Sequence, residues 1–231
     1  MNVYLVGCEC AGKTTLAGEI LKWGEKAMGG IRHFHDHFTI PSSELNSESG
    51  EALKNAPPQL KEMFQRYMLE YHISPGMLDT SRIPDGNLMG HAIEEAVYAP
   101  LYYGYGGKNS GAPGRSPEGA RTEMARFMEK KILELAPNTV LVLMKASPEV
   151  IRSRMEEDPA TKPGEPTPGV VLQEDVEHVL GRFQEEYEWS LIQNKFILDT
   201  TSASVEETFS EFLEKHDPYT TEADRLRMQG H

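Results

Sequence analysis

One uninterrupted stretch near the N-terminus limits the fold more than any other part of the sequence. Its first part, 2–6, is apolar and predicts a buried strand, and its last part predicts a helix that ends near Met28. Leu16, Ile20 and Leu21 give that helix one apolar face at the helical period of about 3.6 residues. Between strand and helix lies a loop with the spacing G-x-x-x-x-G-K-[ST], made of Gly7, Cys8, Glu9, Cys10, Ala11, Gly12, Lys13 and Thr14.

The chemistry of this loop is that of an anion site. Its glycines allow successive backbone N–H groups to point at one anion, and the N-terminus of the following helix adds partial positive charge. Lys13 can reach the β- and γ-phosphates of a nucleotide, and the Thr14 hydroxyl can take a place on Mg²⁺, with Thr15 next to it. The loop therefore predicts that the chain binds ATP and Mg²⁺. A chance match, or a loop that no longer binds nucleotide, is the alternative.

The rest of the chain alternates predicted strands with predicted helices. Four further segments are typical of strands, at 31–38, 87–93, 139–144 and 196–198. With helices between them, this order predicts an α/β fold: a parallel sheet of about five strands covered on both faces, in three layers α/β/α. Ligands of such sheets bind at the carboxyl ends of the strands, where the glycine loop lies.

Helices and insertions complete the single predicted domain, 1–231. Pro57 and Pro58 begin one helix, and Ser147 is the N-cap of another. The apolar side of the first of these helices is expected to point inward, and its residues are Leu60, Met63, Phe64, Tyr67, Met68 and Tyr71. Mobile insertions are predicted at 41–58, 104–119 and 158–170. The tail from Asp217 is polar and gives no structural signal.

Composition excludes several classes of protein. Lys and Arg number 23 against 36 for Asp and Glu, and the resulting net charge of −13 argues against bulk nucleic-acid binding. No apolar run approaches the roughly 20 residues that span a bilayer, and a strand that starts at Asn2 leaves no room for a cleavable signal. Cys8 and Cys10 are too few for a disulfide framework or a zinc site. We therefore expect a cytoplasmic protein without membrane contact.

The sequence lacks the motifs of other nucleotide-binding classes. A GTPase needs D-x-x-G and N-K-x-D, but no Asp has a Gly three residues later, and the string N-K-F-I places Ile197 where Asp is required. The predicted strand 139–144 is followed by Lys145 instead of the terminal carboxylate of a motor ATPase. The string L-S-G-G-Q does not occur either. The class that remains transfers phosphate to a small molecule.

Two stretches resemble the nucleoside monophosphate kinases, and most of all the thymidylate kinases. Residues 139–154 are similar to their strand, capped turn and arginine-bearing helix. Phe183 and Tyr187, followed by 196–207, are similar to their last long helix, last strand and nucleobase loop. The resemblance covers the phosphate loop and the C-terminal third, whereas 32–120 departs from the pattern. It implies the P-loop NTPase fold and ATP as phosphate donor.

The resemblance also implies roles for single residues. In this group the second strand ends in an acid that engages the substrate or the magnesium shell, and Asp36 holds that place, with a surface Asp as the alternative. His37 is a further candidate substrate contact, and Thr201 lies in the loop that faces adenine. Arg152 and Arg154 follow the capped helix, and guanidinium groups stabilise the charge of a transferring phosphoryl group. Two residues apart on a helix they diverge, so we expect one of them to reach the phosphates.

Other residues are candidates for contact with the phosphate acceptor. The cations available for an acceptor phosphate are Arg66, Arg82, Arg115 and Arg121, of which Arg66, Arg115 and Arg121 are the predicted contacts. Tyr98 and Tyr102 would stack on a base or line an acceptor pocket, with plain packing as the equal alternative.

An acid pair bears on the type of acceptor. Glu94 and its neighbour Glu95 are candidates for a general base or for a ligand of magnesium. Alcohol acceptors often use a carboxylate base, whereas phosphate acceptors need no strong base. This pair therefore hints at an alcohol acceptor.

Together these patterns predict an ATP-dependent small-molecule kinase that phosphorylates a nucleoside monophosphate or a nucleoside with Mg-ATP. Two alternatives stay open: a kinase of a non-nucleotide metabolite alcohol, and a nucleotide-binding regulator or slow NTPase. The expected partner is a small-molecule phosphate acceptor, and a homodimer is left open.

Overall fold

The computed structural model describes residues 1–30, 32–34, 46–74, 86–106, 120–157 and 169–230. Three predicted site residues, Asp36, His37 and Arg115, lie outside these ranges and stay predictions. Much of each predicted insertion also lies outside them, so their predicted mobility is untested.

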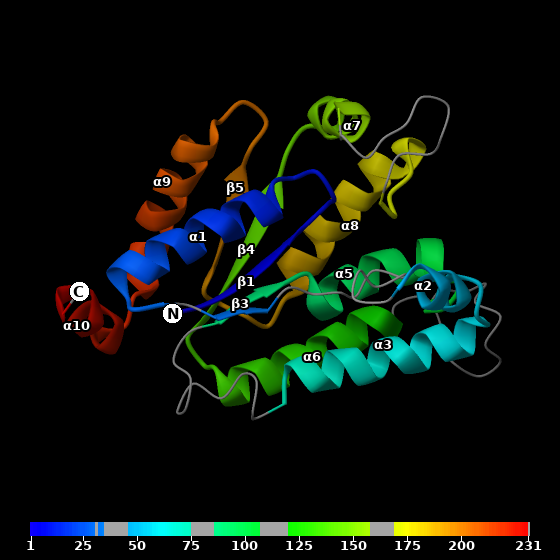
Figure 1. The fold of residues 1–231 in the computed structure, drawn as a ribbon, viewed down its shortest axis with the longest axis horizontal. Coiled ribbons are helices and arrows are strands. Elements are labelled where there is room, and N and C mark those ends of the chain that lie inside the picture. The colour runs from blue at the N-terminus through cyan, green and yellow to red at the C-terminus, as the bar shows by residue number, and fades with distance from the viewer. Residues whose placement is uncertain (31, 35–45, 75–85, 107–119, 158–168, 231) are drawn as a thin grey trace.

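A five-stranded parallel sheet forms the centre of the described part of the chain, in the order β2-β3-β1-β4-β5 (Figure 1). The strands are β1 (Asn2–Gly7), β2 (Arg32–Phe34), β3 (Gly86–Met89), β4 (Thr139–Lys145) and β5 (Lys195–Asp199). Val3 of β1 pairs with Asn87 of β3 and with Val140 of β4. Every residue of β1 is buried, as expected for a central strand covered on both faces.

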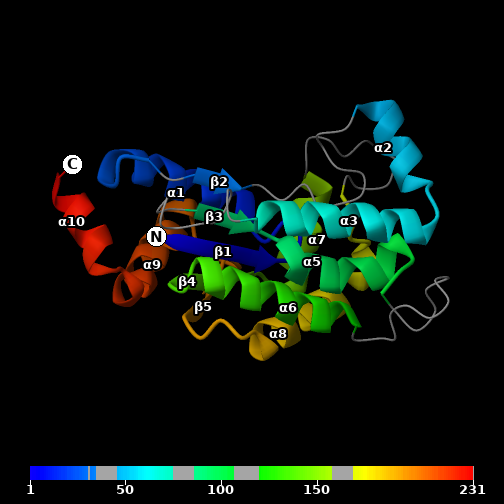
Figure 2. The same ribbon diagram turned by 90° about the horizontal axis from the view of Figure 1, so that it is seen from below.

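Helices cover both faces of this sheet. The described α-helices are α1 (Lys13–Ala27), α2 (Ser47–Lys54), α3 (Pro58–His72), α5 (His91–Tyr98), α6 (Ala120–Leu135), α7 (Pro148–Glu157), α8 (Val176–Trp189), α9 (Val205–His216) and α10 (Glu222–Gly230). α1 and α9 pack together on one face, whereas α5, α6 and α8 lie on the other, with α3 alongside α6 (Figures 1 and 2). The predicted three-layer α/β/α fold and its number of strands are confirmed. Among the described residues, no helix combines the length and apolar character needed to cross a membrane.

Three elements differ from the sequence prediction. The strand predicted at 87–93 ends early, because Gly90 (φ 75°) and His91 (φ 44°) turn the chain into α5. Part of the predicted insertion at 41–58 is the helix α2, and the tail after Asp217 contains the helix α10. Both helices are short, with eight and nine residues, and largely polar, so few apolar residues mark them in the sequence.

The inward face predicted for α3 is wrong. The side of α3 that packs against the protein carries Glu62, Gln65, Leu69 and His72. Four side chains predicted to point inward are between 47% and 67% exposed, namely Leu60, Met63, Tyr67 and Tyr71. Polar contacts orient the helix instead: the ring Nε2 of His91 lies 3.0 Å from the carbonyl oxygen of Leu69.

A buried group of three charged residues joins α3, α5 and α6. Arg121 Nη2 donates to Glu62 Oε1 at 2.9 Å, and Arg121 Nη1 donates to Glu95 Oε1 at 3.0 Å. The three residues are 5%, 1% and 1% exposed. Burial raises the pKa of Glu95, and the neighbouring charge of Arg121 acts against that rise. Arg121, a predicted acceptor contact, is thus a structural link between three helices.

Removing this cation should destabilise the fold strongly. In an Arg121→Leu variant Glu95 would stay buried without its cation and Glu62 would keep only the more exposed Arg66, and breaking such a buried ion pair costs about 3–5 kcal/mol of unfolding free energy. Urea unfolding followed by circular dichroism measures the loss. The control is Arg225→Leu, whose ion pair with Asp217 has side chains 50% and 65% exposed and is worth less than about 1 kcal/mol. Equal losses in the two variants would contradict the structural role of Arg121.

Candidate functional site

The phosphate loop, residues 7–14, turns from β1 into α1 in contact with the backbone of β4. Gly7 has φ 147°, and a Cβ there would lie 2.4 Å from the carbonyl oxygen of Met144, so the position requires glycine. Gly12 precedes α1 with φ 93°, and Cys10 has φ 62°, which is uncommon for a residue with a side chain. Positive φ angles at three nearby positions curl the backbone tightly, as the loop motif predicts.

Lys13 lies against the loop and against α5. Its Nζ donates to the carbonyl oxygens of Gly7 at 2.6 Å and Cys8 at 3.1 Å, and it lies 2.9 Å from Glu94 Oε1. The Lys13 and Glu94 side chains are 11% and 7% exposed. Neighbouring residues on a helix point about 100° apart, so Glu95 turns away to Arg121. Of the predicted acid pair, Glu94 is the member beside the phosphate loop.

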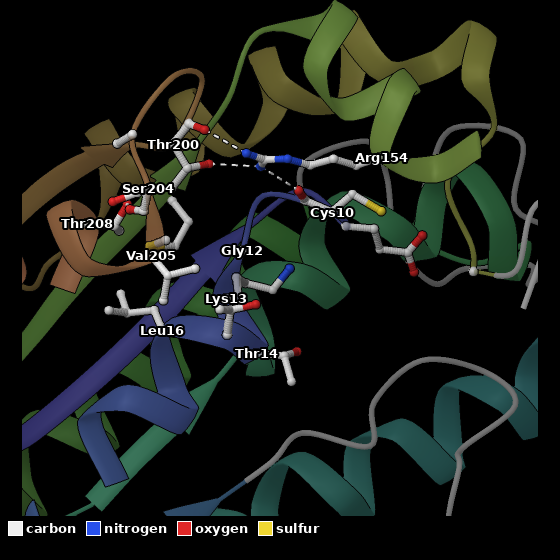
Figure 3. Close-up of a pocket in the computed structure, with 15 residues that line it drawn as sticks. Cys10, Gly12, Lys13, Thr14, Leu16, Arg154, Thr200, Ser204, Val205 and Thr208 are labelled. Atoms are coloured by element: carbon white, nitrogen blue, oxygen red, sulfur yellow. Dashed lines mark hydrogen bonds between the residues drawn. The ribbon is translucent and has the colours of Figure 1, made fainter. Parts of the chain in front are cut away.

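Arg154 bridges the phosphate loop and the loop after β5 (Figure 3). Its Nη1 donates to the Cys10 carbonyl oxygen and to Thr200 Oγ1, both at 3.0 Å, and its Nη2 donates to the Thr200 carbonyl oxygen at 2.7 Å. Arg152 points elsewhere and pairs with Glu177. The structure therefore brings one of the two predicted arginines to the loop, as their spacing on a helix indicated.

A cavity of about 670 Å³ lies beside the phosphate loop, which is a size typical of small-molecule sites. It is bounded by the loop, by Arg154 and by the start of α9 (Figure 3). The lining residues are Glu9, Cys10, Gly12, Lys13, Thr14, Thr15, Leu16, Met144, Arg154, Gly169, Thr200, Ala203, Ser204, Val205 and Thr208. Most of the predicted phosphate-binding residues thus share one space with Arg154.

The wall formed by the loop after β5 differs from the prediction. Thr201, predicted to face adenine, does not line the cavity, and its Oγ1 accepts a hydrogen bond from the Ser147 N–H at 2.9 Å. Thr200 and the first turn of α9 line the cavity instead. A sequence signal for this wall existed, because Ser204 and Glu207 have the spacing of a capping box and form one. A capping box marks the start of a helix, and here the start of α9 forms this edge of the cavity.

The two tyrosines predicted to contact the acceptor form hydrogen bonds with other residues of the protein. Tyr98 is 1% exposed, and its hydroxyl accepts a hydrogen bond from the Glu9 N–H at 3.2 Å. Its ring meets that of Phe183 edge-on, with centroids 5.6 Å apart. The Tyr102 hydroxyl donates to Asp175 Oδ2 at 2.9 Å. Neither tyrosine lines the cavity, and contact with an acceptor stays a prediction for both.

The predicted acceptor cations in the described part of the chain are paired with acids. Arg66 Nη2 lies 3.4 Å from Glu62 Oε1, and Arg121 lies between Glu62 and Glu95. Neither arginine lines the cavity.

Magnesium would find few protein ligands here. Within the described ranges, no three His, Cys, Asp or Glu side chains gather as a metal site. Thr14 lines the cavity, and the Glu94 carboxylate lies beside Lys13. Mg²⁺ commonly keeps several waters and binds one or two carboxylates together with substrate phosphates. One hydroxyl and one carboxylate fit that requirement.

The two thiols of the phosphate loop differ in environment. Cys8 is 0% exposed, and burial raises the pKa of its thiol to about 12. Cys10 is half-buried and lines the cavity, and neither residue forms a disulfide. Because the thiolate is the reactive form, Cys8 is chemically inert near neutral pH.

Comparison with known proteins supports the fold. Neither the protein-family models nor the curated proteins searched match the sequence. A deoxyadenosine kinase from M. mycoides with bound dATP has a TM-score of 0.57 and 16% identity, over 93% of this chain and 98% of that one. The YorR protein from Bacillus subtilis, in complex with phosphorylated GDP, has a TM-score of 0.52 and 16% identity, over 96% and 99%. At such identities the likeness shows a shared α/β fold.

The thiol environments predict selective alkylation. Under mildly alkaline conditions, iodoacetamide should modify Cys10 at least about tenfold faster than Cys8, whose thiolate is scarcely populated. Mass spectrometry of the peptide that contains both residues, with fragmentation, assigns the label. A Cys10→Ser variant is the control and should take up almost no reagent while folded. Equal labelling of the two cysteines would show that Cys8 is not buried as described.

Proposed function

We propose that this chain is an ATP-dependent kinase that transfers the γ-phosphoryl group to a hydroxyl group of a small molecule, with a nucleoside as the favoured acceptor. The observation that carries the proposal is the convergence of Lys13, Glu94 and Arg154 on the phosphate loop beside one cavity. Phosphoryl transfer depends on positioning and charge stabilisation, and these three groups supply both.

Lys13 and Arg154 are the cations of the proposed reaction. Lys13 would turn from Glu94 to the β- and γ-phosphates, which are the ligands that the loop motif assigns to it. Arg154 is already held by three hydrogen bonds, which use three of the five donors of a guanidinium group. A cation that is fixed before the reaction stabilises the transferring group without a cost of reorganisation.

Glu94 has two roles in the proposal. Once Lys13 moves to the phosphates, the Glu94 carboxylate would lose its cation and could accept the proton of an acceptor hydroxyl or bind Mg²⁺. Thr14 would supply a hydroxyl ligand to the same ion. When bound, Mg²⁺ would supply positive charge against the charge that develops on the phosphates.

The placement of the arginines favours a hydroxyl acceptor over a phosphate acceptor. A second phosphate would need its own cations. Of the predicted acceptor cations, the two in the described part of the chain, Arg66 and Arg121, are paired with Glu62 and Glu95, and Arg115 lies outside it. The carboxylate beside Lys13 is the group that a hydroxyl acceptor needs. The fold shared with a deoxyadenosine kinase is consistent with a nucleoside as the acceptor. Asp36, outside the described residues, stays a predicted acceptor contact.

An acceptor screen tests this choice. With Mg-ATP, we expect phosphorylated product from at least one nucleoside and none from thymidylate or other nucleoside monophosphates. The reason is that Arg66 and Arg121, which could hold the phosphate of such an acceptor, are already paired with Glu62 and Glu95. Mass spectrometry of the reaction mixture identifies the product. Product from a monophosphate alone would contradict the hydroxyl acceptor, and product from a non-nucleotide alcohol alone would contradict the nucleoside. Slow ATP loss that is the same with every acceptor and with none would favour a regulator or slow NTPase.

Loss of the loop ammonium group should abolish transfer. We expect Lys13→Met to lower the turnover number at least about 100-fold, because the variant lacks the cation nearest to the transferring group. Turnover is measured with the acceptor from the screen, and circular dichroism verifies the fold. The control is Lys22→Met on α1, where the side chain is 70% exposed and pairs with Glu19. Full turnover of the Lys13 variant would refute the kinase proposal.

A further inference from the structure

The phosphate loop contains an acid that the proposed reaction does not use. Glu9 lines the cavity, where its negative charge disfavours a triphosphate. Among the described residues, no cation forms a salt bridge with its carboxylate. The Val170 N–H donates to Glu9 Oε1 at 3.0 Å and to Oε2 at 2.9 Å, and the Val171 N–H donates to Oε2 at 3.0 Å. Two successive backbone amides therefore bind one carboxylate of the loop.

The surroundings of Glu9 are shaped to this contact. Gly169 has φ 120°, and a Cβ there would lie 2.5 Å from Glu9 Oε2, so a side chain at this position would displace the carboxylate. The main chain of Glu9 is also held, because its N–H donates to the buried Tyr98 hydroxyl at 3.2 Å. Burial raises the pKa of Glu9, while the amides of Val171 and Val170 lower it.

The same segment is anchored at further points. The Leu172 N–H donates to the Tyr102 hydroxyl at 3.4 Å, and that hydroxyl donates to Asp175. Arg152 of α7 donates to the carbonyl oxygen of Gln173 at 3.1 Å. Residues 169–175 are thus tied both to the phosphate loop and to the helix that carries Arg154.

Adjacent residues of the phosphate loop hold both sides of this arrangement. The Cys10 carbonyl oxygen accepts a hydrogen bond from Arg154, near the end of α7. The carboxylate of its neighbour Glu9 accepts hydrogen bonds from the N–H groups of Val170 and Val171. A movement of residues 169–171 away from the loop would pull on α7 through the contact between Arg152 and Gln173. These contacts connect Glu9 to the helix that carries Arg154.

We infer that Glu9 is a positioning residue: its carboxylate clamps residues 169–171 onto the phosphate loop and so holds Arg154 in place for transfer. The clamp itself stands on contacts within the chain, whereas its effect on the rate rests on the proposed function. Without Glu9 the cavity would lose a negative charge, so nucleotide affinity should rise. It would also lose the clamp, so turnover should fall.

Two measurements that do not require catalysis test the clamp first. Hydrogen exchange of the Val170 and Val171 amides should be at least about tenfold faster in Glu9→Ala than in the wild type, because the carboxylate protects them. The affinity of a non-hydrolysable ATP analogue with Mg²⁺, measured by calorimetry, should rise severalfold. The matched control is Glu25→Ala on α1, which removes an exposed carboxylate and should change neither quantity. Unchanged exchange at Val170 and Val171, or weaker nucleotide binding, would overturn the inference.

A second variant breaks the clamp from the other side. Gly169→Ala places a methyl group where Glu9 Oε2 lies, so it should also accelerate exchange at Val170 and Val171. The double variant with Glu9→Ala should add little to either single variant, because both remove one contact. Additive effects would overturn the inference, and circular dichroism checks that each variant is folded.

Turnover separates the clamp from the proposed reaction. With an acceptor that yields product, kcat should fall about tenfold in Glu9→Ala while KM for ATP stays the same or falls, and Glu9→Gln should retain part of the rate. An unchanged kcat would overturn the positioning role. If no acceptor yields product, the proposed function fails, while hydrogen exchange and calorimetry still decide whether the clamp exists.

Discussion

The backbone of β4 approaches the phosphate loop so closely that the loop cannot shift without breaking the sheet. The carbonyl oxygen of Met144 occupies the space in which a side chain at Gly7 would lie. β1 is fully buried between β3 and β4, and its last residue, Gly7, pairs with Met144 of β4. Every other group of the site, from Lys13 to Arg154, is placed relative to this rigid backbone, and close-packed interiors transmit such constraints to their neighbours.

Around this rigid loop, nearly every charge has a partner close by. Lys13 lies beside Glu94, Arg121 lies between two buried carboxylates, and backbone amides bind Glu9. Pairing of this kind is needed because an isolated buried charge is costly. It also gives the proposed reaction a definite order of events. In that reaction a triphosphate would enter beside Glu94, and Lys13 would exchange this carboxylate for phosphate.

The sequence patterns that were reliable were those that rest on the backbone. The loop motif, the strands predicted at 2–6, 139–144 and 196–198, and the Ser147 cap were predicted correctly, because steric limits and hydrogen-bonding needs act locally. Predictions that required the direction of a side chain were less reliable. In α3 the aromatic and aliphatic side was chosen as the core face, yet Glu62 lies inside because Arg121, far along the chain, meets it there.

Local sequence by itself determined that a buried strand, a tight glycine loop and a helix follow one another in β1, the phosphate loop and α1, because apolar periodicity and glycine conformations act locally. Only the tertiary structure decided which neighbour of each candidate pair reaches the site: Glu94 instead of Glu95, and Arg154 instead of Arg152. The physical reason is the same in both pairs. Residues one or two apart on a helix point in different directions, and the choice between them depends on which helix face the rest of the fold covers.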